Sequence, residues 1–244
     1  MENKDRDLTY ENVIQLDDAK TASRNFIANV FMWMFLALGI SAFFAYLFAN
    51  DLSLMRLLIN TETSGLSALG MVVVFSPLAF VMIMNFGFNR ISFPVLVALF
   101  IAYSSLMGIS LSFIFLAYTA GSIAALFLVA ALVFGVMAVA GYITHQDLTS
   151  FGSLMMMGLV GIILASVVNM FIHSAQLDMI ISYVGVAVFV GLTAYKVQML
   201  KQIGSGLEYG DATGKKLALI GAMSLYITFI NLFLSLLRIF GRRR

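Results

Sequence analysis

The chain has 244 residues, of which 61% are hydrophobic and only 11% are charged, and its mean hydropathy is +1.00. This composition excludes an ordinary soluble domain, in which about a quarter of the residues are charged. We therefore expect an integral membrane protein whose main partner is the lipid bilayer, with no nucleic-acid partner.

The first 25 residues are polar and contain both signs of charge, which predicts a cytoplasmic N-terminal tail that is mobile or lies on the membrane surface. The apolar run that follows is longer than the apolar region of a signal peptide, so we expect it to stay in place as the first membrane span. Residues 26–240 are expected to form one transmembrane domain. Residues 241–244 form a basic C-terminal tail.

Seven stretches of about 20 residues lack charge, apart from Lys196 near the end of the sixth. A helix of this length crosses a bilayer core of about 30 Å. Their apolar character is continuous rather than alternating, so helices are indicated instead of barrel strands. The predicted fold class is an all-α membrane protein, a bundle of seven helices. The predicted spans are 26–48, 66–88, 93–118, 122–143, 151–172, 179–200 and 217–237.

The distribution of lysine and arginine predicts the orientation, because basic loops tend to stay in the cytoplasm. Arg56 lies on the opposite side from the N-terminal tail, and so do the arginines from Arg238 onward if the last segment crosses the membrane. The N-terminus is expected inside whether the last segment crosses or re-enters, and the side of the C-terminus stays open. The basic residues on the side of the N-terminal tail are Lys4, Arg6, Lys20, Arg24, Arg90, Lys196, Lys201, Lys215 and Lys216.

The last span carries a polar stripe with spacings of three and four residues, which places its members on one helical face. Small and hydroxyl residues in such a stripe let membrane helices approach closely and form hydrogen bonds. The alternative is that the stripe lines a hydrated cavity, because Asn231 and Arg238 would be costly against lipid. Both interpretations place this helix in the interior. The stripe consists of Gly221, Ser224, Thr228, Asn231, Ser235 and Arg238.

Three further residues stand out within or beside the apolar runs. Pro77 lies midway along the second span, where it removes a backbone hydrogen bond and is expected to kink the helix. Arg90 follows that span and either extends to the headgroups or acts as an inward-facing electrostatic latch. Lys196 lies near the end of the sixth span, where it either extends to the headgroups or is buried and bonded to a neighbouring helix.

Catalysis is not expected, because the residues that it needs are missing or dispersed. The chain has no cysteine and two histidines, His145 and His173, so neither disulfides nor a local zinc motif are indicated. Between residues 63 and 207 the only acidic residues are Asp147 and Asp178, both in expected loops, which leaves no aspartate pair for intramembrane proteolysis. We expect no catalytic residue, no metal site and no cofactor.

Three segments in this order resemble the transmembrane Bax inhibitor motif family, in its Bax inhibitor-1-like, bacterial type. They read "GYITHQDLTSFGSLMMMGLVGIILASVVNMF", "SYVGVAVFVGLTAYKVQMLK" and "AMSLYITFINLFLSLLRIFG". The resemblance implies a seven-helix bundle with the last helix central, enclosed by the other six, and for this chain a bacterial inner membrane. It also implies a pH-sensitive calcium leak in some members and, in a bacterial branch, modulation of a membrane-bound AAA protease.

The leak of the family depends on two intramembrane aspartates and an arginine latch, and the matching positions here are Lys196, Thr228 and Arg90. A carboxylate pair can share a proton and can offer oxygen ligands to calcium. Lysine carries a positive charge across physiological pH in water and offers no oxygen. We therefore predict that the diaspartyl calcium gate is absent, and that the Lys196 ammonium fastens the sixth span to Thr228 or to backbone carbonyls of the seventh.

Two classes of function remain open. In the first, the protein serves ion homeostasis through an altered or closed pore, with Ser224, Thr228, Asn231 and Ser235 lining a cavity. In the second, it is a non-channel modulator of a partner membrane protein such as a membrane-bound AAA protease, and the charged tail is the contact for that partner.

Overall fold

The computed structural model describes the backbone of residues 2–60, 65–206 and 212–243, with side chains at positions 21–60, 65–206 and 213–243. These residues form helices joined by short connections, together with one two-stranded hairpin in which Ile59 pairs with Leu66. The elements are α1 (Glu2–Asn50), α2 (Leu52–Leu58), β1 (Ile59–Asn60), β2 (Gly65–Leu66), α3 (Ala68–Phe86), α4 (Phe93–Leu111), α5 (Ile114–Ala117), α6 (Ala120–Ile143), α7 (Thr149–Ile172), α8 (Ala175–Ser205) and α9 (Ala212–Phe240).

Seven helical segments are long and apolar enough to cross a membrane, which confirms the predicted number and order of spans. The third crossing combines α4 and α5, which are separated by a short break at residues 112–113. Each observed segment either matches its predicted range within a few residues or extends beyond it. The extensions arise because helices continue into polar sequence, where hydropathy alone gives no signal. The segments are Thr21–Asn50, Ala68–Phe86, Phe93–Ala117, Ala120–Ile143, Thr149–Ile172, Ala175–Ser205 and Thr213–Phe240.

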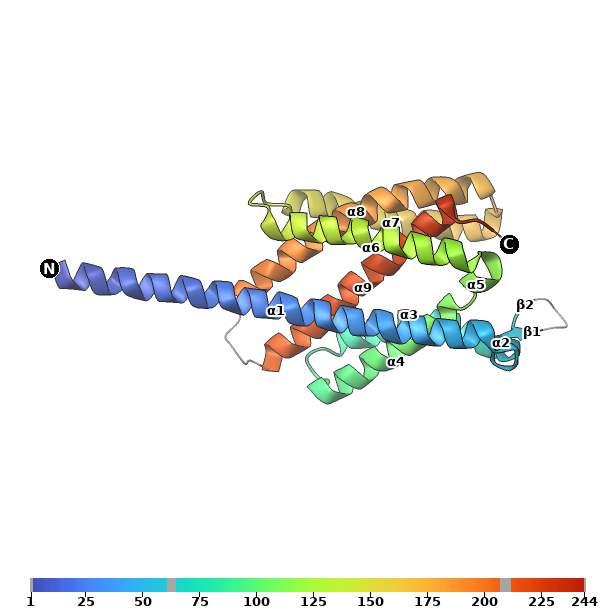
Figure 1. Ribbon diagram of the computed structural model, residues 1–244, viewed down its shortest axis with the longest axis horizontal. Helices are drawn as coiled ribbons and strands as arrows, with labels where there is room; N and C mark the ends of the chain where they lie inside the picture. Colours follow the sequence, from blue (N-terminus) through green and yellow to red (C-terminus); the bar gives the residue numbers. More distant parts are fainter. Residues whose placement is uncertain (1, 61–64, 207–211, 244) are drawn as a thin grey trace.

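Helix α1 differs from the expected polar tail, because its backbone is helical from Glu2 to Asn50 without a break. Figure 1 shows the first part of α1 projecting beyond the rest of the bundle, in line with the span that follows it. Composition indicated that residues 1–25 are polar, but it did not indicate that the helix of the first span continues through them.

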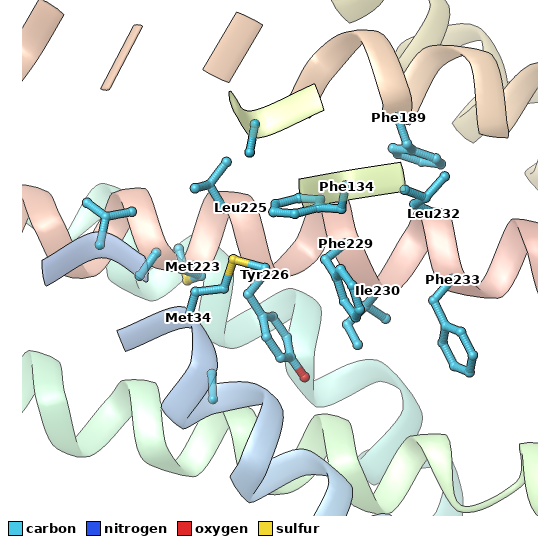
Figure 2. Close-up of a cluster of buried hydrophobic side chains, with 14 of the residues drawn as sticks. Met34, Phe134, Phe189, Met223, Leu225, Tyr226, Phe229, Ile230, Leu232 and Phe233 are labelled. Carbon is cyan, nitrogen blue, oxygen red and sulfur yellow. The ribbon is translucent and has the colours of Figure 1, made fainter. Parts of the chain in front are cut away.

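Helix α9 is the most buried of the seven spans, with 67% of its most apolar window buried, compared with 50% for α8 and none for α7. It packs against α1, α4, α6 and α8. Figure 2 shows its side chains meeting Met34 of α1, Phe134 of α6 and Phe189 of α8. The interior position expected for the last helix therefore agrees with its burial, whereas its enclosure by all six other spans stays a prediction.

Helix α9 also runs from one end of the bundle to the other. Near its start, the Lys216 ammonium donates to the Phe88 carbonyl oxygen at 3.5 Å, beside the connection between α3 and α4. Beyond its end, the Thr119 backbone N–H donates to the Arg242 carbonyl oxygen at 3.1 Å, at the start of α6. These two connections follow the second and third spans, so they lie at opposite ends. The last segment crosses the bundle and does not re-enter.

Pro77 lies inside α3 and is buried, and it cannot donate a backbone hydrogen bond to the Val73 carbonyl one turn earlier. Two hydroxyl groups satisfy that oxygen instead: Ser76 Oγ on the same helix at 3.1 Å and Ser110 Oγ of α4 at 3.2 Å. In a membrane such a replacement is needed, because lipid offers no hydrogen bond. The proline thus links α3 to α4, and the kink itself stays a prediction.

Helices α1 and α4 approach closely at Gly108. A Cβ atom added there would lie 2.5 Å from the backbone oxygen of Ser41 and 2.7 Å from its Cα, so only glycine allows this contact. By contrast, a Cβ atom added at Gly135 of α6 would meet nothing within 4 Å.

We predict that Gly108→Ala lowers the free energy of unfolding by about 1–3 kcal/mol, the usual cost of overpacking. Gly135→Ala is the matched control and should cause no loss, since alanine is the better helix former. Thermal unfolding of both purified variants in the same detergent provides the measurement. Equal stability of the two variants would contradict the close contact between α1 and α4.

Candidate functional site: the α8–α9 seam

The polar stripe of α9 faces α8, and the two helices run antiparallel along it. We call this contact the α8–α9 seam. At one end the Gly221 position is so close to Leu200 that an added Cβ would lie 2.6 Å from the Leu200 Cδ2 atom. Farther along, an added Cβ at Gly185 would lie 2.8 Å from Ser235 Oγ. The seam comprises Leu200 with Gly221, Lys196 with Ser224 and Thr228, Gly185 with Ser235, and Asp178 with Arg238.

Lys196 occupies the seam with its ammonium group bonded to α9. Its Nζ donates to Thr228 Oγ1 at 2.8 Å and to the Ser224 carbonyl oxygen at 3.3 Å. The Thr228 hydroxyl donates its own proton to the same Ser224 oxygen at 2.9 Å, so its lone pairs are free to accept from the lysine. The predicted bond between Lys196 and Thr228 is confirmed, and the ammonium is held by the neighbouring helix.

A cavity of about 340 Å³ lies beside Lys196, between the seam and α3. Val81 and Asn85 of α3 form one wall, and Lys196 and Ser224 are among the residues that line the other. Most of the remaining lining is aliphatic. Of the predicted cavity residues in α9, Ser224 borders this space.

The other members of the stripe have separate roles. Asn231 Nδ2 donates to the Ile227 carbonyl oxygen of its own helix at 2.8 Å, so this bond does not join α9 to another helix. Ser235 is buried against Gly185. Thr228 is buried as well, beneath the Lys196 ammonium. Along most of its length the stripe is therefore a close-packing surface, which was the first of the two interpretations.

Arg90 lies outside this arrangement. It is exposed, in the connection between α3 and α4, and it does not line the cavity beside Lys196. Among the residues that the structure describes, its side chain has no hydrogen-bond or ion-pair partner. This position fits an arginine that extends to the headgroups better than an inward-facing latch.

One expectation about the acidic residues was wrong. Asp178 was expected in a loop, but α8 begins at Ala175 and places Asp178 in its first turn. There it lies 3.7 Å from an Arg238 nitrogen, a pair that is partly exposed and so contributes at most about 1 kcal/mol. Asp147 does lie in a loop, where hydrogen bonds from the hydroxyl and backbone N–H of Thr149 hold the pKa of its carboxyl below the usual range.

Sequence reasoning missed a second hydroxyl network, in the interior. The Tyr226 and Ser41 hydroxyl oxygens lie 2.6 Å apart, and Ser41 Oγ donates to the Ser104 carbonyl oxygen at 2.7 Å, so this chain of bonds joins α9, α1 and α4. The Tyr103 ring packs edge-on against the Tyr226 ring, with 5.7 Å between the ring centroids. Serine and tyrosine within an apolar run look like ordinary membrane residues, and only the structure shows which of them meet.

The seam provides hydrogen-bond donors and the positive charge of the Lys196 ammonium, which is held by α9. An ammonium cannot coordinate a cation, and it opposes the approach of calcium. Among the described residues, no group of three or more histidine, aspartate or glutamate side chains could hold a metal ion. The arrangement joins two helices and provides no cation site at Lys196.

We predict that Thr228→Val lowers the free energy of unfolding by about 1–2 kcal/mol more than Thr193→Val, because the Lys196 ammonium loses an acceptor. Thr193 is a matched control, since it is buried in α8 and its hydroxyl donates only to the Phe189 carbonyl of its own helix, at 2.7 Å. Equilibrium unfolding in mixed micelles measures both variants. Equal losses would show that the Lys196 bond adds nothing to stability.

Comparison with known proteins gives one family. The model of the family described as "Inhibitor of apoptosis-promoting Bax1" matches residues 23–244. The chain is 43% identical over 222 residues to "Inner membrane protein YbhL" of Escherichia coli K12, covering 91% of this chain and 93% of that protein. An uncharacterized protein of Borreliella burgdorferi is 41% identical over 219 residues, covering 90% and 92% of the two chains. The chain therefore belongs to the family of inhibitors of apoptosis-promoting Bax1.

Proposed function

We propose that this chain serves ion homeostasis as a non-enzymatic protein of the bacterial inner membrane, with a pore that the α8–α9 seam keeps closed to calcium. The observation that carries the proposal is the Lys196 ammonium bonded to Thr228 Oγ1 at 2.8 Å. Its position matches the place where the resembling leak proteins hold a pair of aspartates. The inner-membrane location is supported by the name of the Escherichia coli relative and by the seven apolar spans.

The charge of the site supports a closed pore. Two carboxylates at these positions repel each other when ionised, and they attract calcium. A lysine and a threonine attract each other instead, and their bond draws α8 and α9 together. A divalent cation that approached this point would meet a positive charge held in a medium of low dielectric constant, where repulsion is strong.

We predict that the purified chain in proteoliposomes shows no calcium uptake that rises on acidification. The double variant Lys196→Asp with Thr228→Asp should gain such uptake severalfold, because it places two titratable carboxylates where Lys196 and Thr228 now meet. Uptake is followed with a calcium dye enclosed in the vesicles. The control variant, Lys196→Met with Thr228→Val, breaks the same bond without adding an acid and should stay inactive.

Two results would count against the proposal. Acid-stimulated uptake by the unmodified chain would show that calcium passes without the aspartates. No uptake by the folded double aspartate variant would show that no pore lies behind the seam, and would favour the non-channel modulator.

The proposed orientation places the N-terminus and the connection between α6 and α7 in the cytoplasm. The connection between α5 and α6 then lies on the outer side, at the opposite end of α6. Because the chain has no cysteine, each introduced thiol reports on a single place.

We expect a membrane-impermeant thiol reagent applied to intact spheroplasts to label Gly121→Cys and not His145→Cys. Both positions are exposed and lie near opposite ends of α6. Permeabilised cells are the control, in which both variants should react. Labelling of only His145→Cys in intact spheroplasts would invert the orientation.

A further inference from the structure

A second cavity, independent of the seam, lies near the opposite end of the bundle from the N-terminus. It is a groove of about 520 Å³ between α1 and α6, with α9 beneath it, and α5 lies at its end. This volume lies within the range of small-molecule sites. Alanines on both walls leave the space open, Ala42 and Ala45 on α1 and Ala120 and Ala124 on α6. We call this space the α1–α6 groove.

The α1–α6 groove opens to the surface of the bundle within the apolar spans. Tyr46 and Leu128 line it and expose 66% and 64% of their area. The helices around it are candidate membrane spans, so hydrocarbon rather than water surrounds its opening. Its lining is almost entirely aliphatic and aromatic, and an apolar space of this kind takes up an apolar chain in preference to water.

Two arginines are fixed at the end of the groove. The Arg242 backbone N–H donates to Ser122 Oγ at 2.9 Å, the Thr119 N–H donates to the Arg242 carbonyl, and Arg243 pairs with Tyr118 in a short antiparallel bridge. These contacts bracket Ala120, which lines the groove. The chain that carries both guanidinium groups is thereby tied to the first turn of α6, where the groove ends.

The charges of these arginines are available for a ligand. Arg242 and Arg243 are exposed, and within the described residues neither forms an ion pair. Of the described acids at this end of the bundle, Asp178 is paired with Arg238, and Asp51 accepts hydrogen bonds from the Ser53 hydroxyl and from the backbone N–H groups of Ser53 and Leu54. A planar guanidinium binds a phosphate with two parallel hydrogen bonds, so a pair of arginines at the end of an apolar groove complements a phosphate attached to an acyl chain.

We propose that the α1–α6 groove binds one anionic phospholipid, with an acyl chain between α1 and α6 and the headgroup phosphate on Arg242 and Arg243. The chain contacts Ile230 and Phe233 of α9 at the bottom of the groove. The site differs from the general lipid surroundings because it joins a shaped apolar space to two charges whose backbone is tied to the start of α6. It does not depend on whether the pore is open or closed.

Native mass spectrometry of the full-length protein, released from detergent with defined lipids, tests this site. We expect one phosphatidylglycerol to be retained about tenfold more tightly than phosphatidylcholine with the same acyl chains, because basic residues near a membrane favour anionic lipid. Arg242→Gln with Arg243→Gln should remove that preference. Arg56→Gln is the control, since Arg56 lies in the last turn of α2, a helix that contributes no residue to the groove.

A second pair of variants tests the apolar part. Ala124→Phe and Ala42→Phe fill the groove from opposite walls, and each should reduce retention of both lipids, with thermal unfolding used to confirm that the variants are folded. Equal retention of the two lipids by the unmodified protein would overturn the proposal. So would a loss in Arg56→Gln as large as in the double arginine variant, or unchanged retention in both folded phenylalanine variants.

Discussion

The bond between the Lys196 ammonium and the Thr228 hydroxyl determines how the two most buried helices meet. An ammonium within an apolar span must find an acceptor, because lipid provides none. Helix α9 presents two acceptor oxygens to this ammonium, Thr228 Oγ1 and the Ser224 carbonyl oxygen, from residues one turn apart in the helix. Once this contact is made, the antiparallel register places Ser235 on Gly185 and Arg238 beside Asp178. The rotation of α9, and therefore the face that it turns to the other helices, follows from it.

The same constraint explains two other polar contacts within the spans. The Val73 carbonyl that Pro77 leaves free is satisfied by Ser110 of the neighbouring helix, and Tyr226 is satisfied by Ser41. Each of these bonds joins helices that are not held by hydrophobic attraction, since lipid is as apolar as the side chains. Close packing and a few interhelical hydrogen bonds therefore carry the specificity of the bundle.

The sequence predicted the seven spans well, because charged residues mark most of the connections and apolar length marks the helices. It also predicted the face of α9 that packs, from the period of Ser224, Thr228 and Ser235. A period identifies the face of a helix but not the helix that packs against it. A bond from Lys196 to a neighbouring helix was one of two expectations, and Thr228 as its acceptor came only from comparison with the family motif. The Ser41 network and the α1–α6 groove could not be predicted, since they depend on how distant helices meet.

The most direct test of this account is a double-mutant cycle of Lys196→Met and Thr228→Val, measured as free energies of unfolding in one detergent. Lys196→Met alone has two opposing effects on stability: it removes a hydrogen bond, and it also removes a charge that is costly to bury. Only the coupling between the two substitutions isolates the interaction of Lys196 with Thr228. We predict a coupling free energy of about 1 kcal/mol or more, with Thr228→Val costing little once Lys196 is methionine. If the losses of unfolding free energy in the two single variants add up to the loss in the double variant within about 0.3 kcal/mol, the bond does not hold the two helices together.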